Sequence, residues 1–158
     1  MRKGIFAVFG VFALFTLLVC SQVSAQDECA APGRLAFNEV AGSGTEVATA
    51  EGDTTASTVE AEAISAACNY RGSKADWYIV IGNGEVITAA TCNNASFDTR
   101  VSVLTGDCDA LECVGTNDDG PGCAGYTSTF RWKSEADVAY RILVHGYGSG
   151  TAGTYTVT

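Results

Sequence analysis

The sequence predicts an all-β protein, an antiparallel β-sandwich of about eight strands held together by three disulfides. From about residue 75 onward, short apolar segments of period two alternate with Gly, Asn, Asp and Ser, which is typical of antiparallel strands. No long helical pattern interrupts them. Each strand offers one apolar face, so two sheets have to pack face to face to bury these faces.

The first segment is typical of a secretory signal peptide. Arg2 and Lys3 precede an apolar stretch over residues 4–20, and Val23-Ser24-Ala25 supplies the small residues of a cleavage site. We expect residues 1–25 to be removed. A membrane anchor is the alternative, because the apolar stretch approaches a spanning length, but no charged stop-transfer flank follows it.

Removal of residues 1–25 leaves 133 residues, which is enough for one domain with one core. The remaining chain has 7 basic residues against 18 acidic ones, a net charge of −11. Such a surface repels nucleic acid and anionic lipid and attracts Ca²⁺ and cationic partners, although solubility alone also explains it. We therefore expect a secreted, extracellular protein with no nucleic-acid partner and no membrane contact in its mature form.

The strongest strand candidates alternate apolar and polar side chains over five to ten residues. They are 76–82, 86–91, 99–104, 111–116, 128–134, 139–148 and 153–158. The tetrapeptide Gly-Asn-Gly-Glu at 82–85 predicts a hairpin turn between the first two of them. Residues 26–55 form an N-terminal segment or the first strands, with 35–40 and 57–64 as weaker candidates. A helix is the alternative for 56–67 because of its Ala and Glu content.

Six cysteines remain after signal cleavage, and an even number in a secreted chain predicts three disulfides. If Cys108 and Cys113 face each other across the turn between strands 99–104 and 111–116, paired residue numbers sum to about 221. That register places Cys92 and Cys123 at the open end of the same hairpin, where they can bond. Elimination then pairs Cys29 with Cys68. Zinc is disfavoured, because the chain has no paired CxxC motif and one histidine.

Six segments, in order, resemble the bacterial pre-peptidase C-terminal domain family, particularly its cysteine-containing secreted variants. They are "DWYIVIGNGEVITAATC", "FDTRVSVLTGDC", "LECVGTNDDG", "STFRWKS", "AYRILVHGYG" and "GTYTVT", within residues 56–158. The resemblance implies a jelly-roll-like β-sandwich without catalytic activity. Relatives in clostridial collagenases bind collagen and Ca²⁺, so it also implies a binding role.

The loop "GTNDDGPGC" at 115–123 is the candidate metal site. Ca²⁺ takes six to eight oxygen ligands, and Asn117, Asp118 and Asp119 precede a flexible Gly-Pro-Gly. Asp98, in the family-like "FDT", is the natural additional ligand, provided that the loop folds back from its expected position opposite Cys123. The alternative is a simple turn, in which Asn and Asp bond to nearby backbone.

Catalytic chemistry is not expected. Asp118 and Asp119 are adjacent, so in an extended chain their side chains point to opposite sides, unlike a glycosidase pair. His145 lacks a GxSxG nucleophile turn and is expected on an exposed strand face, as a surface histidine.

Three tyrosines lie in or beside Gly-rich loops, where rigid rings can stack on sugars or pack on an extended peptide: Tyr70, Tyr126 and Tyr147. Asn94 begins an N-glycosylation sequon. Together these features indicate a secreted, non-catalytic binding or adhesion module for extracellular protein or polysaccharide, with a structural Ca²⁺. The alternative is a purely structural domain of a larger secreted or surface protein.

Overall fold

The computed structural model describes residues 28–59, 68 and 73–158. The expected signal peptide, Tyr70 and most of the weak candidate at 57–64 lie outside these residues. The described chain is all-β, as predicted, and the three disulfides form. Among the described residues, no helix has the length and apolar character needed to cross a membrane.

One layer is a five-stranded sheet with the order β1-β5-β10-β7-β8. Its strands are β1 (Gly33–Arg34), β5 (Ala75–Ile81), β10 (Ala139–Gly146), β7 (Thr99–Thr105) and β8 (Glu112–Asn117). All neighbours are antiparallel except β1, which pairs parallel with β5. The sandwich is therefore antiparallel with one short parallel exception.

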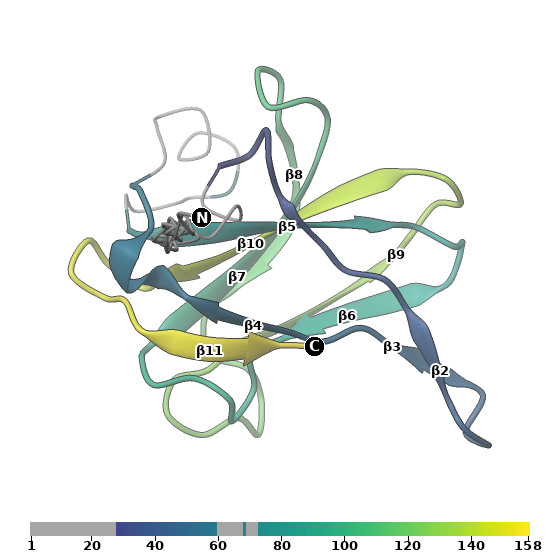
Figure 1. The fold of residues 1–158 in the computed structure, drawn as a ribbon, viewed down its shortest axis with the longest axis horizontal. Coiled ribbons are helices and arrows are strands. Elements are labelled where there is room, and N and C mark those ends of the chain that lie inside the picture. Colours follow the sequence, from purple (N-terminus) through teal and green to yellow (C-terminus); the bar gives the residue numbers. More distant parts are fainter. Residues whose placement is uncertain (1–27, 60–67, 69–72) are drawn as a thin grey trace, which may run out of the picture.

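The other layer consists of three short ladders. In these ladders β4 (Ala50–Asp53) pairs with β11 (Thr154–Val157), β6 (Val86–Ala90) pairs with β9 (Thr129–Lys133), and β2 (Asn38–Val40) pairs with β3 (Thr45–Val47). A 3-10 helix, η1 (Thr54–Ala56), follows β4. In Figure 1 strands β5, β10 and β7 are drawn above strands β4, β11 and β6 of the other layer.

The main core fills the space between the layers. Apolar side chains of β5, β7 and β10 meet those of β6, β9 and β11, including Val103, Ile142, Ile87, Trp132 and Val157. Period-two alternation supplies these residues, because every second side chain of each strand points to the same face. Trp132 and Val157 are buried in this way, within the predicted strands 128–134 and 153–158.

A second, smaller core covers the outer face of the five-stranded sheet. It contains Cys68, Ala75, Trp77, Leu104 and Leu143, with Cys29 and Leu111 packed against it. This explains why β7 has buried side chains on both faces. The sequence pattern predicted one solvent face there, because it does not show that distant disulfide-linked segments cover it.

The turn at 82–85 differs from the prediction. Strands β5 and β6 both form, but β5 pairs with β10 and β1, whereas β6 pairs with β9. The Asn83 side chain accepts a hydrogen bond from the Glu85 amide, and Gly84 has a φ of 83°. The segment therefore turns tightly, but it carries the chain from one layer to the other and is not a hairpin turn.

The disulfides are Cys29–Cys108, Cys68–Cys113 and Cys92–Cys123. The predicted Cys92–Cys123 bond is confirmed, and the other two predicted pairings are wrong. Cys113 lies opposite Leu104 inside the β7–β8 ladder, whereas Cys108 lies in the connecting loop, so the two do not face each other. A β-bulge between Val103 and Leu104 contributes to this register.

Candidate functional site

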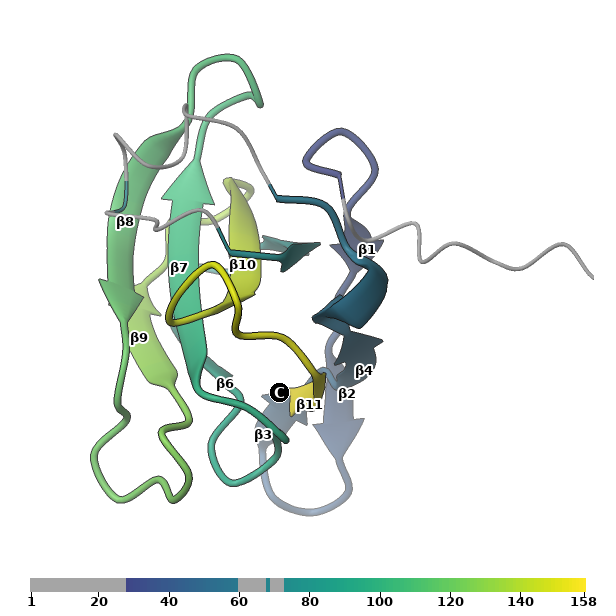
Figure 2. The ribbon, with the colours of Figure 1, turned by 90° about the vertical axis from the view of Figure 1, so that its left-hand side faces the viewer.

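Three carboxylates meet at one end of the sandwich. Asp98 directly precedes β7, and Asp118 and Asp119 directly follow β8. One oxygen from each of the three side chains lies within 4.8 Å of the others. We call Asp98, Asp118 and Asp119 the acidic cluster. Figure 2 shows the loops after β6 and after β8, which carry these residues, at the same end of the molecule.

The register of β7 and β8 brings the cluster together. Val101 pairs with Asn117 and Val103 pairs with Gly115, about three residues away from the expected register. Asp98 therefore lies nearer to Asp118 than to Cys123. The loop after β8 does not have to fold back to bring the aspartates together. Asp118 and Asp119 share the site because β8 ends at Asn117, so the alternation of an extended strand no longer separates them.

Charge repulsion and burial act on the same group in this cluster. Burial, followed by the negative charges of Asp118 and Asp119, raises the pKa of Asp98, and Arg100 opposes the change. Oδ1 of Asp98 and Oδ1 of Asp118 are buried and accept no hydrogen bond from the described residues. The Arg100 Nε lies 3.7 Å from Asp118 Oδ1 and supplies the nearby positive charge. The cluster therefore offers oxygen ligands to a cation, beside one resident guanidinium.

Asn117, the fourth predicted ligand, forms a side-chain hydrogen bond to the backbone. Its Oδ1 accepts a hydrogen bond of 3.0 Å from the Thr129 amide, which ties the end of β8 to the start of β9. Ser128 Oγ donates to the carbonyl of Thr99 and also contacts that of Asp118. The amide oxygen of Asn117 thus holds the loop, and the three aspartates supply the clustered oxygens.

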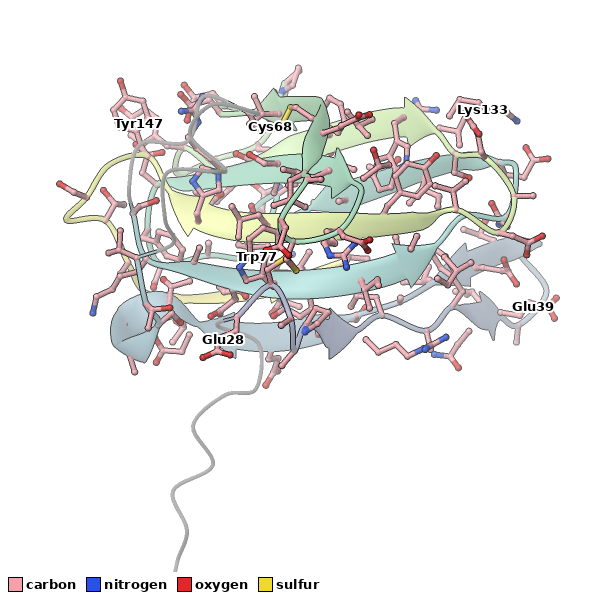
Figure 3. All side chains as sticks on the ribbon, turned by 90° about the horizontal axis from the view of Figure 1, so that it is seen from above. Glu28, Glu39, Cys68, Trp77, Lys133 and Tyr147 are labelled. Atoms are coloured by element: carbon pink, nitrogen blue, oxygen red, sulfur yellow. A yellow bond between two sulfur atoms is a disulfide. The ribbon has the colours of Figure 1, made fainter. Side chains whose placement is uncertain are left out.

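The backbones of two predicted tyrosines form hydrogen bonds with the same peptide unit. The Tyr147 amide donates to the Asp98 carbonyl at 3.1 Å, and the Thr99 amide donates to the Tyr126 carbonyl at 3.1 Å. Both rings are exposed, Tyr126 by 68% and Tyr147 by 42%. Tyr147 projects at one end of the molecule, and Lys133 lies at the other (Figure 3). The peptide between Asp98 and Thr99 therefore links the acidic cluster to two exposed aromatic rings.

Asn94 is exposed in the loop between β6 and β7, where a sequon has to lie to be modified. Its Nδ2 donates to the Cys92 carbonyl at 3.1 Å. It also lines a shallow pocket of about 360 Å³, together with Glu51, Thr154 and Tyr155.

His145 contradicts the expectation of a surface histidine, because it is fully buried. Its Nε2 lies 3.0 Å from Ser102 Oγ, and its Nδ1 lies 3.3 Å from Ser73 Oγ. Burial lowers the pKa of His145 to about 4. Ser102 is also fully buried, so this serine and histidine pair has no access to a substrate. The second core covers this face of the sheet. Because the strand has no continuous apolar pattern, the sequence did not indicate that this face is buried.

Asp76 is a second buried polar residue. It lies within β5 and accepts hydrogen bonds from Ser57 Oγ and from the Tyr155 hydroxyl. The Tyr155 hydroxyl also bonds that of Tyr78 at 2.7 Å. Burial raises the pKa of Tyr78 to about 12 and raises that of Tyr155 as well. This network is enclosed and holds the strands together.

Comparisons of the chain with protein-family models, with curated proteins and with solved structures found no match.

Proposed function

We propose that this chain is a non-catalytic binding or adhesion module that acts outside the cell, with a Ca²⁺ ion in the acidic cluster. The observation that carries the proposal is the meeting of three carboxylates within 4.8 Å. Carboxylate oxygens are the ligands that Ca²⁺ prefers, and water and backbone carbonyls complete its coordination. The three disulfides support an oxidising compartment, where free Ca²⁺ is abundant enough for a weak site.

The ion would have a defined mechanical effect. It would offset the burial and the repulsion that raise the pKa of Asp98, and Asp98 carries the peptide carbonyl that accepts a hydrogen bond from the Tyr147 amide. Fixing Asp98 would therefore fix the loops that present Tyr126 and Tyr147. Pre-ordered aromatic rings bind a protein or polysaccharide with a smaller loss of conformational entropy. Membership of the pre-peptidase C-terminal family is part of this proposal.

Thermal melting with Ca²⁺ and with chelator tests the metal site. An ion that binds only the folded state raises the midpoint as its concentration increases. Asp119→Asn should reduce the increase, and Glu112→Gln, which removes an exposed carboxylate from β8, should leave it unchanged. An unchanged midpoint of the parent protein at saturating Ca²⁺ would contradict the metal site.

Binding to arrays of collagenous and polysaccharide ligands tests the second half of the proposal. Tyr147→Ala and Tyr126→Ala should lose binding, and Val114→Ala, which removes another exposed apolar side chain, should retain it. Binding that requires Ca²⁺ supports the coupling between the ion and the tyrosines. Absence of binding to every ligand, with and without Ca²⁺, would favour the alternative of a purely structural domain.

A further inference from the structure

In the second layer of the sandwich, no strand of the part of the chain that the structure describes lies between β3 and β6. A pocket of about 290 Å³ lies there, lined by β3 and the following Ala48, by four residues of β6, and by Thr158. In Figure 1, β3 and β6 diverge on either side of the end of β11. We define this pocket as the slot; its lining residues are Thr45, Glu46, Val47, Ala48, Val86, Ile87, Thr88, Ala90 and Thr158.

Thr158, which directly follows β11, lines the slot beside β6. Thr158 exchanges two hydrogen bonds of 2.9 Å with Ala90 of β6. On its other side, Val157 pairs with Ala50 of β4. The end of β11 is therefore flanked by β4 and β6, and beyond Thr158 the same space continues between β3 and the first half of β6. The slot therefore lies in line with β11, where a further strand would continue the ladder.

The backbone of β6 is oriented to pair with such a strand. In an antiparallel ladder, residues bond alternately to the two neighbours. Glu85 and Thr91 bond to β9, whereas Ala90 bonds to Thr158. Val86 and Thr88 lie four and two residues before Ala90, so their backbone groups point to the same side as those of Ala90. Their amide and carbonyl groups therefore point into the slot. Within residues 28–59, 68 and 73–158, no backbone hydrogen bond to these groups is found.

The existing registers define which side chains an added strand would face. Continuing β11 in register, its first residue would lie between Ala48 and Ala89 and its third between Glu46 and Ile87. Ala48, Ala89 and Ile87 are buried, so both positions share the core-facing side. Two alanines leave room for a branched aliphatic side chain at the first position.

Charge defines the chemistry of the third position. Glu46 lines the slot and lies directly opposite Glu39 across the β2–β3 ladder, and both glutamates are exposed. Like charges in directly opposed positions destabilise a hairpin. Neither glutamate forms a salt bridge with another residue that the structure describes. A lysine at the third position would pack its stem on Ile87 and place its ammonium beside Glu46.

From these observations we propose that the slot binds an extended basic peptide by β-strand addition. The peptide lies antiparallel to β6, places a small aliphatic residue between Ala48 and Ala89, and places a lysine or arginine beside Glu46. The slot lies at the end that carries Glu39 and Lys133, away from Tyr147 (Figure 3). The proposal is therefore independent of the acidic cluster and can be tested in chelator.

Amide hydrogen exchange of the full mature chain tests the proposal with a synthetic peptide that contains Val-Thr-Lys-Thr. At saturation, exchange of the Val86 and Thr88 amides should slow at least about tenfold, because they become hydrogen-bonded. The Val114 amide, on the other outer strand β8, should not change. A peptide with proline in place of the first threonine, or glutamate in place of lysine, should bind at least about tenfold more weakly.

Variants of the slot provide the matching controls. Thr88→Pro removes an amide that points into the slot and leaves the bonds of β6 to β9 in place, so it should abolish binding, whereas Thr88→Val should retain it. If the proline variant does not fold, Glu46→Lys should reverse the preference to the glutamate peptide. The proposal would be overturned if the peptide gave no protection, or if it protected β8 instead. It would also be overturned if protection grew with protein concentration in the absence of peptide, because a second copy of the chain would then occupy the slot.

Discussion

The hydroxyl of Tyr155 donates a hydrogen bond of 2.7 Å to Oδ2 of Asp76, across a sequence separation of 79 residues. This contact joins the final strand of one layer to the five-stranded sheet of the other. Both side chains are buried, so the bond forms where water cannot replace it.

Tyr155→Phe should reduce the free energy of unfolding by about 1–3 kcal/mol, because the buried carboxylate loses a donor. Urea denaturation measures the loss. Tyr126→Phe removes a hydroxyl from an exposed ring and should cost much less. An equal loss of unfolding free energy in both variants would show that the hydrogen bond from Tyr155 to Asp76 does not stabilise the fold.

Asp98→Asn should raise the melting temperature of the chelator-treated protein and remove its response to Ca²⁺. The pKa of Asp98 is raised in the folded state, so the ionised group opposes folding at neutral pH, and this opposition disappears as the pH falls through the folded pKa. Asparagine keeps the shape without the charge. A variant that melts lower in chelator would indicate that Asp98 instead stabilises the loop through Arg100.

Stability should fall as the pH drops from about 6.5 to about 4, and His145 is a cause. The pKa of His145 is lowered to about 4 in the folded state, so between these values the unfolded chain takes up a proton that the folded chain does not. The slope approaches about 1.4 kcal/mol per pH unit for one group. Since the chain has one histidine, its ring resonances can be followed directly. Titration near pH 6.5 in the folded protein would contradict the burial.

Gly115→Ala should lower the free energy of unfolding by about 1–3 kcal/mol, because the added methyl group overpacks the core. An added Cβ would lie 2.2 Å from Cζ of Phe130. Gly148→Ala is the matched control, since no atom lies within 4 Å of the corresponding Cβ. Thermal or urea unfolding should separate the two, and equal stability would mean that Phe130 moves away without cost.

Peptide mapping under non-reducing conditions should recover Cys29 linked to Cys108, Cys68 to Cys113, and Cys92 to Cys123. Replacing both Cys29 and Cys108 by serine should cost about 2–4 kcal/mol, mainly because the unfolded chain gains freedom. The other two bonds should persist in that variant. A peptide that links Cys108 to Cys113 would contradict the register of β7 and β8.

Strand positions were predictable from the sequence because period-two alternation is a local signal. It located β5, β7 and β10 to within a few residues. Pairing was less predictable. The same Gly and Asn residues allow a tight turn whether the next strand lies alongside or in the other layer, so the segment at 82–85 did not reveal which layer β6 joins.

In the candidate site, too, the residue types were predictable from the sequence but their arrangement in space was not. Residue types identified Asp98, Asp118 and Asp119 as oxygen donors, but their proximity depends on a register that a bulge between Val103 and Leu104 helps to set. Burial of His145 was not predictable, because segments far away in the chain cover its strand face. Long-range cross-links of this kind leave no periodic signal in the strand that they shield.

Each disulfide joins one cysteine from residues 108–123 to a cysteine that precedes it, across separations of 79, 45 and 31 residues. A chain that enters an oxidising compartment from its N-terminus therefore exposes Cys29, Cys68 and Cys92 before any native partner has arrived. Bonds among these early thiols are the first ones available, and all of them are non-native. Wherever such early bonds form, correct maturation requires thiol–disulfide exchange, in which the late segment displaces them. Yield in a host should consequently follow its disulfide isomerase capacity more closely than its oxidising power.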